Sequence, residues 1–166
     1  MDLEQMINLH GKAIFRYCHL LLRDYHEAQD AVQITFLRAY YKENNRNPLK
    51  GEFTPWLYKI AYNCCIDILR KRKRHYRFLD EEKNTTDTFY YMEEGMSEEV
   101  RQALGELSPE DRALVISRLM DGMDYEQLSQ IYNVKAAAIR KRYERAKKRL
   151  AQALREQGLE GAYGKK

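Results

Sequence analysis

Apolar residues recur at intervals of three and four along the first half of the chain, which is the spacing that places them on one face of an α-helix. This pattern predicts helices at about residues 2–22, 25–41 and 54–75. The third helix is expected to begin at Thr54-Pro55, with a hydroxyl at the N-cap and proline at the first helical position. The stretch before it contains several Asn, Pro and Gly residues, which is typical of a loop.

The second half of the chain shows the same helical spacing together with clear start signals. It predicts helices at about residues 108–121 and 124–132, each preceded or opened by a capping residue, and a final helix at about 135–157. Gly122 can take the left-handed conformation that ends the first of these helices, and Asn133 can make the turn before the last. A short helix, a tight turn and a longer basic helix form the helix-turn-helix arrangement.

Residues 76–97 lack this spacing, and the charge is distributed unevenly around them. Lys and Arg exceed Asp and Glu by 5 in residues 1–74 and by 5 in residues 100–166, whereas residues 75–99 carry a net charge of −6. With few Gly and Pro and little β-branched alternation, the chain is predicted to be all-α. We expect two small helical domains at 1–75 and 98–158, an acidic linker at 76–97 and a tail at 159–166. Two basic segments around an acidic one favour binding to a polyanion.

The final helix has the side chains expected for reading duplex DNA. Its apolar residues define an inner face, which leaves Arg140, Lys141, Glu144 and Arg145 on the exposed side. Arginine and lysine donate to guanine, and a glutamate can accept from cytosine. The alternative is a basic amphipathic helix that only keeps the domain soluble.

The third helix carries a different mixture, in which Trp56, Tyr58 and Tyr62 alternate with Lys59 and precede the basic run 70–74. Aromatic rings beside cations suit unstacked, single-stranded nucleic acid better than an intact duplex. Trp56 could instead be a core residue, which we favour for this side chain.

The remaining reactive residue types suggest no active site. The four histidines are scattered, and Cys18, Cys64 and Cys65 lack the spacing of metal ligands, so buried thiols are the expected state. Neither a phosphate-binding Gly-rich loop nor a nucleophile motif is present in the sequence. We expect no catalytic activity, no cofactor and no metal. Without a signal peptide or a long apolar run, the chain is expected to be cytoplasmic.

Two parts of the sequence resemble the extracytoplasmic-function (ECF, group 4) sigma factors of the bacterial RNA polymerase sigma-70 family. The strings at residues 30–40 and 56–63, followed by Asp67 and Arg70, resemble sigma region 2. The segments at residues 107–112, 121–122, 125–128 and 139–149 resemble region 4. The resemblance implies a region 2-like helical bundle, a region 4-like helix-turn-helix domain, and promoter-specific transcription initiation.

The resemblance also implies a role for individual residues. Asp30, Gln33, Phe36 and Leu37 would contact or support the interface with core polymerase, through its β′ clamp, and the chain would also contact the β subunit. The residues implied to lie along −10 DNA are Asn47, Lys59, Asn63, Asp67 and Arg70. The residues implied to approach −35 DNA are Arg118, Arg140, Lys141, Glu144 and Arg145. Such factors are generally held by an anti-sigma factor, often at the membrane, so this partner is expected as well.

Two departures from the family pattern affect these roles. Ile34 stands where the polymerase-binding helix usually has glutamate. The recognition helix opens with Lys135-Ala136-Ala137-Ala138 in place of a serine cap and a Gly-Thr pair, which removes an N-cap worth about 1 kcal/mol. We therefore assign no −35 sequence preference.

Two other classes of protein compete with this interpretation. An autonomous helix-turn-helix regulator would bind duplex DNA, but it leaves the aromatic and basic third helix and the helix at residues 30–40 without a role. A helical RNA-processing enzyme would require a catalytic cluster, which the sequence does not show.

Overall fold

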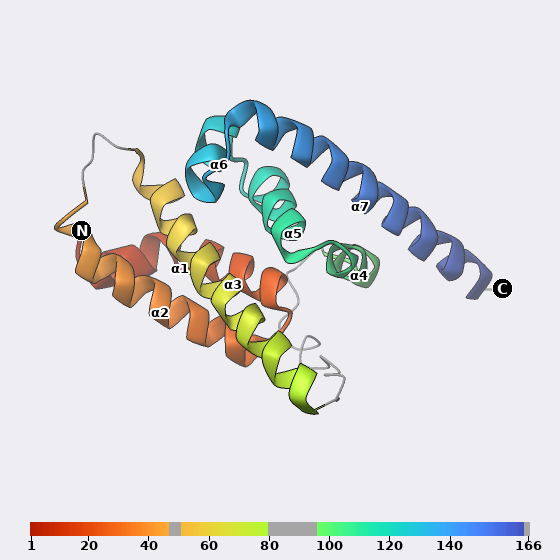
Figure 1. Cartoon of the computed structure of the whole chain (residues 1–166), viewed down its shortest axis with the longest axis horizontal. Helices are drawn as coiled ribbons and strands as arrows, with labels where there is room; N and C mark the ends of the chain where they lie inside the picture. The colour runs from red at the N-terminus through yellow and green to blue at the C-terminus, as the bar shows by residue number, and fades with distance from the viewer. Residues whose placement is uncertain (47–50, 80–95, 165–166) are drawn as a thin grey trace.

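The structure is a computed structural model that describes residues 1–46, 51–79 and 96–164, and its regular elements in these ranges are helices (Figure 1). The all-α prediction is therefore confirmed. Three helices form the N-terminal domain: α1 (Leu3–Leu22), α2 (Tyr25–Glu43) and α3 (Phe53–Leu79). The C-terminal domain contains α4 (Glu98–Glu106), α5 (Pro109–Val115), the π-helical turn η3 (Ile116–Met120), α6 (Tyr125–Tyr132) and α7 (Ala136–Gly164).

Local capping explains where the first two helices begin. Asp2 and Gln5 form a reciprocal capping box at the start of α1, and the Asp24 carboxylate accepts a hydrogen bond from the Glu27 N–H at 2.9 Å. Between them, Arg23 adopts a left-handed conformation with φ of 60°, which ends α1 and turns the chain into α2. The first N–H groups of a helix have no partner within the helix, so these two carboxylates fix where α1 and α2 begin.

The third and last helices differ from the sequence-based prediction at their ends. Helix α3 begins at Phe53, because the Glu52 carbonyl accepts the first helical hydrogen bond from the Trp56 N–H at 3.4 Å, so Thr54 is not the N-cap. The helix then continues past the predicted end at residue 75, and α7 continues past 157. Helix propensity explains neither extension, because the added residues include two aromatic residues in α3 and three glycines in α7. Residues 76–79 of the predicted linker and 159–164 of the predicted tail are thus helical, while 80–95 lie outside the described residues.

The helix predicted at residues 108–121 is divided by a π-helical turn. Helix α5 ends at Val115, and η3 continues to Met120, after which Gly122 takes a φ of 66° as expected. The Ser117 hydroxyl donates to the Ala113 carbonyl at 2.8 Å at this junction. Asn133 has a φ of 54° between α6 and α7, which confirms the predicted turn of the helix-turn-helix.

The two domains pack against each other through α1 and α3 on one side and α5, η3 and α6 on the other (Figure 1). The buried Arg112 of α5 donates to the carbonyl of Leu21 in α1 at 2.6 Å. The rings of Tyr62 and Tyr132 meet edge to face with centroids 4.9 Å apart, and the hydroxyls of Tyr17 and Tyr132 lie 3.2 Å apart. The structure is therefore a closed arrangement with one continuous apolar core.

Candidate polymerase and nucleic-acid interfaces

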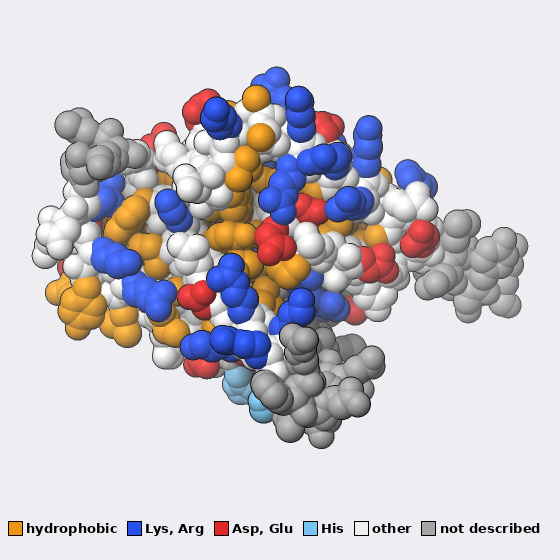
Figure 2. All heavy atoms as spheres, viewed as in Figure 1, with side chains coloured by type: hydrophobic (Ala, Val, Ile, Leu, Met, Phe, Trp, Pro, Cys, Tyr) orange, Lys and Arg blue, Asp and Glu red, His pale blue; other side chains and the backbone are white. Residues whose placement is uncertain are grey.

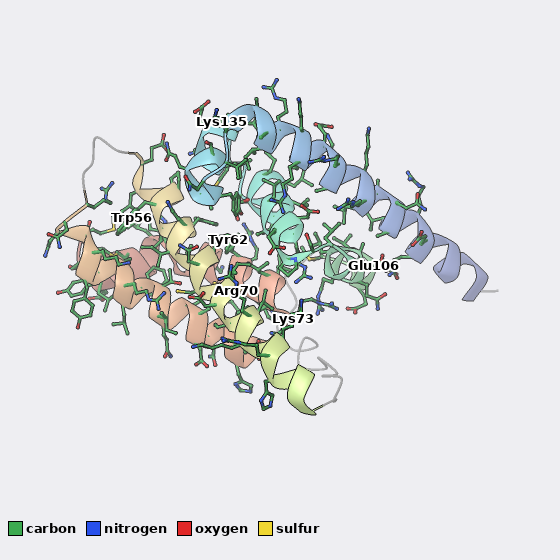
Figure 3. All side chains as sticks on the ribbon, in the orientation of Figure 1. Trp56, Tyr62, Arg70, Lys73, Glu106 and Lys135 are labelled. Atoms are coloured by element: carbon green, nitrogen blue, oxygen red, sulfur yellow. The ribbon has the colours of Figure 1, made fainter. Side chains whose placement is uncertain are left out.

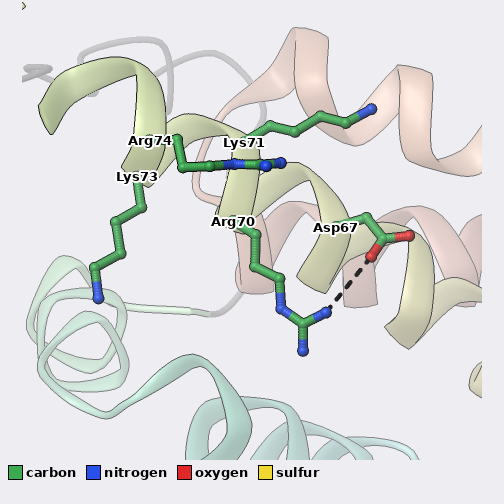
Figure 4. A pocket seen from close by; sticks show the side chains of 5 residues that line it. All are labelled: Asp67, Arg70, Lys71, Lys73 and Arg74. Carbon is green, nitrogen blue, oxygen red and sulfur yellow. Dashed lines mark ion pairs between the residues drawn. The ribbon is translucent and has the colours of Figure 1, made fainter. Parts of the chain in front are cut away.

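The residues predicted to lie along −10 DNA share one exposed face of α3. Lys59, Asn63, Asp67 and Arg70 are all exposed, and their spacing of three and four places them in a row. Asp67 and Arg70 form a long ion pair of 3.9 Å at the surface (Figure 4). An exposed pair of this length contributes little to stability, so both groups can change partners. Asn47, the fifth predicted residue, lies outside the described residues.

This row continues into a shallow basic hollow at the C-terminal half of α3. Figure 4 shows Arg70 and Lys73 directed to one side of the helix and Lys71 and Arg74 to the other. The hollow is lined by Asp67, Arg70, Lys71, Lys73 and Arg74. Four cations around a single carboxylate attract phosphate groups, and such contacts position nucleic acid without reading its sequence.

The N-terminal end of α3 faces the C-terminal domain. The Trp56 ring is half-buried against Phe53, with ring centroids 5.5 Å apart. The guanidinium carbon of Arg46 lies 5.6 Å from the centre of the Trp56 ring. Trp56 (Figure 3) is thus packed on the core, as we favoured, and it also lines a hollow between the domains. That hollow is lined by Asn45, Arg46, Gly51, Glu52, Trp56, Lys59, Ser129, Gln130 and Asn133. In the closed arrangement α6 therefore covers the side of α3 next to Lys59.

The outer face of α2 carries the residues implied for the polymerase contact. Asp30, Gln33 and Leu37 are exposed, whereas Phe36 is only 3% exposed and belongs to the core. Phe36 can therefore support this face but does not present itself to a partner. Further apolar side chains are exposed on the same helix, and the orange patch over α2 in Figure 2 shows how they gather. They are Ile34, Leu37, Tyr40 and Tyr41.

This apolar patch was missed by the sequence analysis, although its signal is present in the sequence. The helix has an apolar inner stripe and a second set of apolar residues three and four positions apart on the opposite side. A helix that is apolar on two faces has one face for the core and one for a partner. In this setting Ile34 adds apolar surface where the family pattern has a charge.

The residues predicted for −35 DNA lie on α7, with one exception. Arg140, Lys141, Glu144 and Arg145 are exposed on this helix, and Glu144 forms an ion pair with Lys147 at 3.2 Å. The exception is Arg118, which belongs to η3.

Arg118 is half-buried and is tied to its own domain, with Nη1 donating to the Met123 carbonyl at 2.9 Å. Its guanidinium carbon lies 4.8 Å from the centre of the Tyr125 ring, and that of Arg140 lies 5.0 Å from the same point.

Two basic residues of α7 form ion pairs with a buried carboxylate of α5. Arg142 and Arg149 donate to the two oxygens of the buried Asp111 carboxylate at 2.9 Å and 3.0 Å. This pairing fixes α7 on the start of α5, because a buried carboxylate is costly without such partners. Arg145 lines a small hollow together with Asp111, Arg142 and Arg149. Helix α7 itself starts at Ala136, with the Lys135 carbonyl accepting from Ile139 at 2.9 Å, and a lysine ammonium has no acceptor with which to cap it.

The contact between the domains is a second feature that the sequence did not predict. The Tyr132 hydroxyl lies 2.9 Å from the Ser117 hydroxyl and donates to the Ala113 carbonyl. It also lies 3.2 Å from the Tyr17 hydroxyl of the N-terminal domain. Burial raises the pKa of Tyr132 well above the usual tyrosine value, so the hydroxyl stays protonated and can donate. An ion pair between Arg16 and Asp121 crosses the same boundary.

Among the described residues, no cluster of His, Cys, Asp and Glu is arranged to hold a metal ion. Within the same ranges, no helix combines the length and apolarity needed to cross a bilayer. The three cysteines are free and buried, as expected from the sequence.

Comparison with known proteins identifies both domains. The sigma-70 region 2 family model matches residues 6–75, and the sigma-70 region 4 model matches residues 97–150. The ECF RNA polymerase sigma factor SigE of Mycolicibacterium smegmatis is 27% identical over 96% of this chain, which spans 64% of that protein. The ECF RNA polymerase sigma factor SigW of Bacillus subtilis is 26% identical, with coverage of 91% of this chain and 88% of SigW.

Solved structures extend the similarity to the arrangement of the two domains. The sigma factor RpoE of Bartonella quintana, in complex with the anti-sigma factor NepR, superposes with a TM-score of 0.79, 25% identity and coverage of 92% of this chain and 96% of that one. The structure of CnrH in complex with the cytosolic domain of CnrY, at 21% identity and a TM-score of 0.70, shares the fold, covering 93% of this chain and 88% of that one. With both regions matched in order, the chain belongs to the sigma-70 family of RNA polymerase sigma factors, in its ECF group.

Proposed function

We propose that this chain binds core RNA polymerase and directs it to promoters by recognising −10 and −35 elements. The observation that carries the proposal is the presence of both family regions, each with an exposed helix face whose chemistry suits its task. Helix α2 offers an apolar and polar surface to protein, whereas α3 and α7 offer cations and amides to nucleic acid. The chain itself has no catalytic role in this scheme, since polymerase supplies the chemistry.

For the polymerase contact, we assign Asp30, Gln33 and Leu37 as surface residues of α2 and Phe36 as the buried support beneath them. Leu37 is 48% exposed, and it continues into the apolar patch on the same helix. An interface core of apolar side chains with a polar rim is the usual composition of a protein–protein contact. The β′ clamp is the expected partner of this patch, and the β subunit is expected to meet the C-terminal domain.

For promoter DNA, we assign Lys59, Asn63, Asp67 and Arg70 to the −10 element. The row on α3 joins amide and carboxylate groups to the basic hollow, so one surface can hold both bases and phosphates. Asn47 belongs to this set by family resemblance. For the −35 element we assign Arg118, Arg140, Lys141, Glu144 and Arg145, the first of which approaches DNA from η3.

Recognition of both elements requires the domains to separate. The centres of the −10 and −35 elements are about 25 base pairs apart by definition, which is about 85 Å of B-form DNA at 3.4 Å per base pair. In the closed arrangement α6 packs against both α3 and α7, and packed helices have axes 8–10 Å apart, so α3 and α7 lie only about 20 Å apart there. Binding to polymerase must therefore supply the free energy that opens the contact between the domains.

An anti-sigma factor is the expected inhibitor. The closed arrangement is similar to that of RpoE in its complex with NepR, which supports this assignment. The chain would then act in the cytoplasm and could be held at the membrane through that partner.

Run-off transcription with purified core polymerase tests the proposal, using templates with and without candidate promoters. Addition of the chain should create new start sites at fixed distances from −10-like and −35-like sequences. If start sites do not change while the isolated chain binds duplex DNA tightly and selectively, the chain is an autonomous helix-turn-helix regulator and the proposal is wrong.

A further inference from the structure

Two of the arginines assigned to −35 DNA meet on one aromatic ring, although they come from different elements. The Tyr125 ring centre lies 4.8 Å from the guanidinium carbon of Arg118 and 5.0 Å from that of Arg140. Tyr125 is the first residue of α6, directly after the capping residue Asp124, whereas Arg118 belongs to η3 and Arg140 to α7. The ring therefore joins three elements of the C-terminal domain at its DNA-facing end.

The ring is fixed by the domain core and not by the arginines. It packs edge to face against Tyr143 with centroids 6.3 Å apart, and Tyr143 is only 4% exposed. Arg118 is also fixed, because it donates to the Met123 carbonyl and its guanidinium carbon lies 6.0 Å from the Tyr143 ring centre. Arg140 differs from both, since it is exposed.

Both guanidinium groups lie within contact distance of the same ring. The electron-rich face of a tyrosine attracts cations, and arginine also stacks on aromatic rings through its planar guanidinium. A free arginine side chain samples many rotamers in solution and loses that freedom when it contacts a base. A ring that already restricts Arg140 reduces this loss, so binding is tighter with no additional contact to DNA.

We propose that Tyr125 is a positioning residue for −35 recognition, holding the Arg140 guanidinium in place on the exposed face of α7. The inference rests on the proposed function, because it concerns the same DNA surface. Tyr125 acts here through the arginine, so its effect on DNA binding depends on Arg140 being present.

A double-mutant cycle with holoenzyme tests this dependence. The probe is the duplex that wild-type holoenzyme enriches most from a library randomised over the −35 window. Tyr125→Met keeps an apolar side chain on Tyr143 but removes the ring, and we expect it to weaken binding to this duplex by about fivefold. Tyr125→Phe keeps the ring and should bind within about twofold of wild type. In an Arg140→Ala background, Tyr125→Met should have no further effect.

Several results would overturn the inference. The first is wild-type affinity for the duplex in Tyr125→Met. The second is a loss of affinity from Tyr125→Met that is equally large in the Arg140→Ala background. The third is an equal loss of affinity from Tyr125→Phe and Tyr125→Met. Thermal unfolding of each variant separates lost positioning from lost folding. If Tyr125→Met does not fold, Arg140→Lys provides the test at an exposed site, since it keeps the charge and loses the planar group. It should bind nearly as weakly as Arg140→Ala, and wild-type affinity would contradict the inference.

The outcome for the wild type distinguishes the two proposals. If wild-type holoenzyme enriches no −35 sequence, the proposed function fails, and the inference fails with it. If it enriches one and Tyr125→Met binds that duplex equally well, only the positioning role is wrong.

Discussion

Replacement of Arg112 by methionine should be among the most destabilising single changes on α5. Arg112 is 7% exposed, and its guanidinium donates to four backbone carbonyls. The acceptors are those of Leu104 at 2.9 Å, Leu21 at 2.6 Å, Gly105 at 3.3 Å and Leu107 at 3.0 Å. Three belong to the end of α4 and the turn that follows, and the fourth is the C-terminal end of α1. One side chain thus caps two helices from different domains.

The size of the effect follows from these hydrogen bonds. Burial, reinforced by the nearby cations of Arg23 and Arg72, lowers the pKa of Arg112 to about 10, so it remains charged at neutral pH. A hydrogen bond from a charged donor contributes about 1.5–3 kcal/mol, and a buried carbonyl without a donor costs about 1–3 kcal/mol. Methionine fills a similar volume and removes the cost of burying a charge, which offsets part of this loss. We expect a net loss of about 3 kcal/mol in the free energy of unfolding.

Urea unfolding followed by circular dichroism measures this quantity. With a slope of about 2 kcal/mol per molar urea, a loss of about 3 kcal/mol lowers the midpoint by about 1.5 M. Arg155→Met is the matched control, since Arg155 is exposed on α7 and should change the midpoint by less than about 0.3 M. A shift for Arg112→Met as small as that of the control would refute the reasoning that the four carbonyls depend on this side chain.

The other predictions concern function, pH and the backbone. In holoenzyme, Lys59→Ala and Asn63→Ala should impair promoter opening measured by permanganate footprinting, whereas Arg140→Ala should mainly weaken closed-complex binding by about 1–3 kcal/mol; equal defects at the closed-complex stage would contradict this division. Burial and the nearby Arg101 lower the pKa of His19 in the folded chain, so the unfolded chain binds this proton more readily. The free energy of unfolding should therefore fall as the pH drops below 6.5, the pKa of histidine in the unfolded chain. Comparison of melting temperatures from pH 7.5 to 5.5 should show a shallower decline for His19→Gln. Gly122→Ala should destabilise by about 1–2 kcal/mol because φ is 66°, whereas Gly158→Ala, inside α7 with open space around it, should stabilise by about 0.5–1 kcal/mol in the same urea assay.

The elements of this fold were largely predictable because their signals are local. The capping box of Asp124 and Gln127, the left-handed turn at Asn133 and the glycine at 122 all follow from the chemistry of neighbouring residues. The exposure of the α3 and α7 faces follows from helical spacing in the same way. The ends of α3 and α7 were less predictable, because the apolar spacing that marks the middle of a helix does not define where the helix ends.

The contacts between distant segments could not be predicted from spacing. Nothing near Arg112 in the sequence indicates that it donates to Leu21, and nothing near Tyr132 indicates that its hydroxyl meets Tyr17. The π-helical turn after Val115 is similar, since the spacing of the residues predicted one continuous helix there. For the same reason the family resemblance implied a DNA-binding role for Arg118 but did not indicate its contact with Tyr125.

The closed contact between the domains has a consequence for how variants of this chain will behave. If only an open form binds polymerase productively, the apparent dissociation constant equals the intrinsic one divided by the open fraction. An open fraction of about one in a hundred would weaken apparent affinity about a hundredfold. Substitutions at Tyr17, Tyr62 or Tyr132 would weaken the contact between the domains and raise the open fraction. They would then tighten binding to polymerase, although none of these side chains contacts it in this scheme. Substitutions that increase activity should therefore occur at the contact between the domains, away from the surfaces that contact promoter DNA or polymerase.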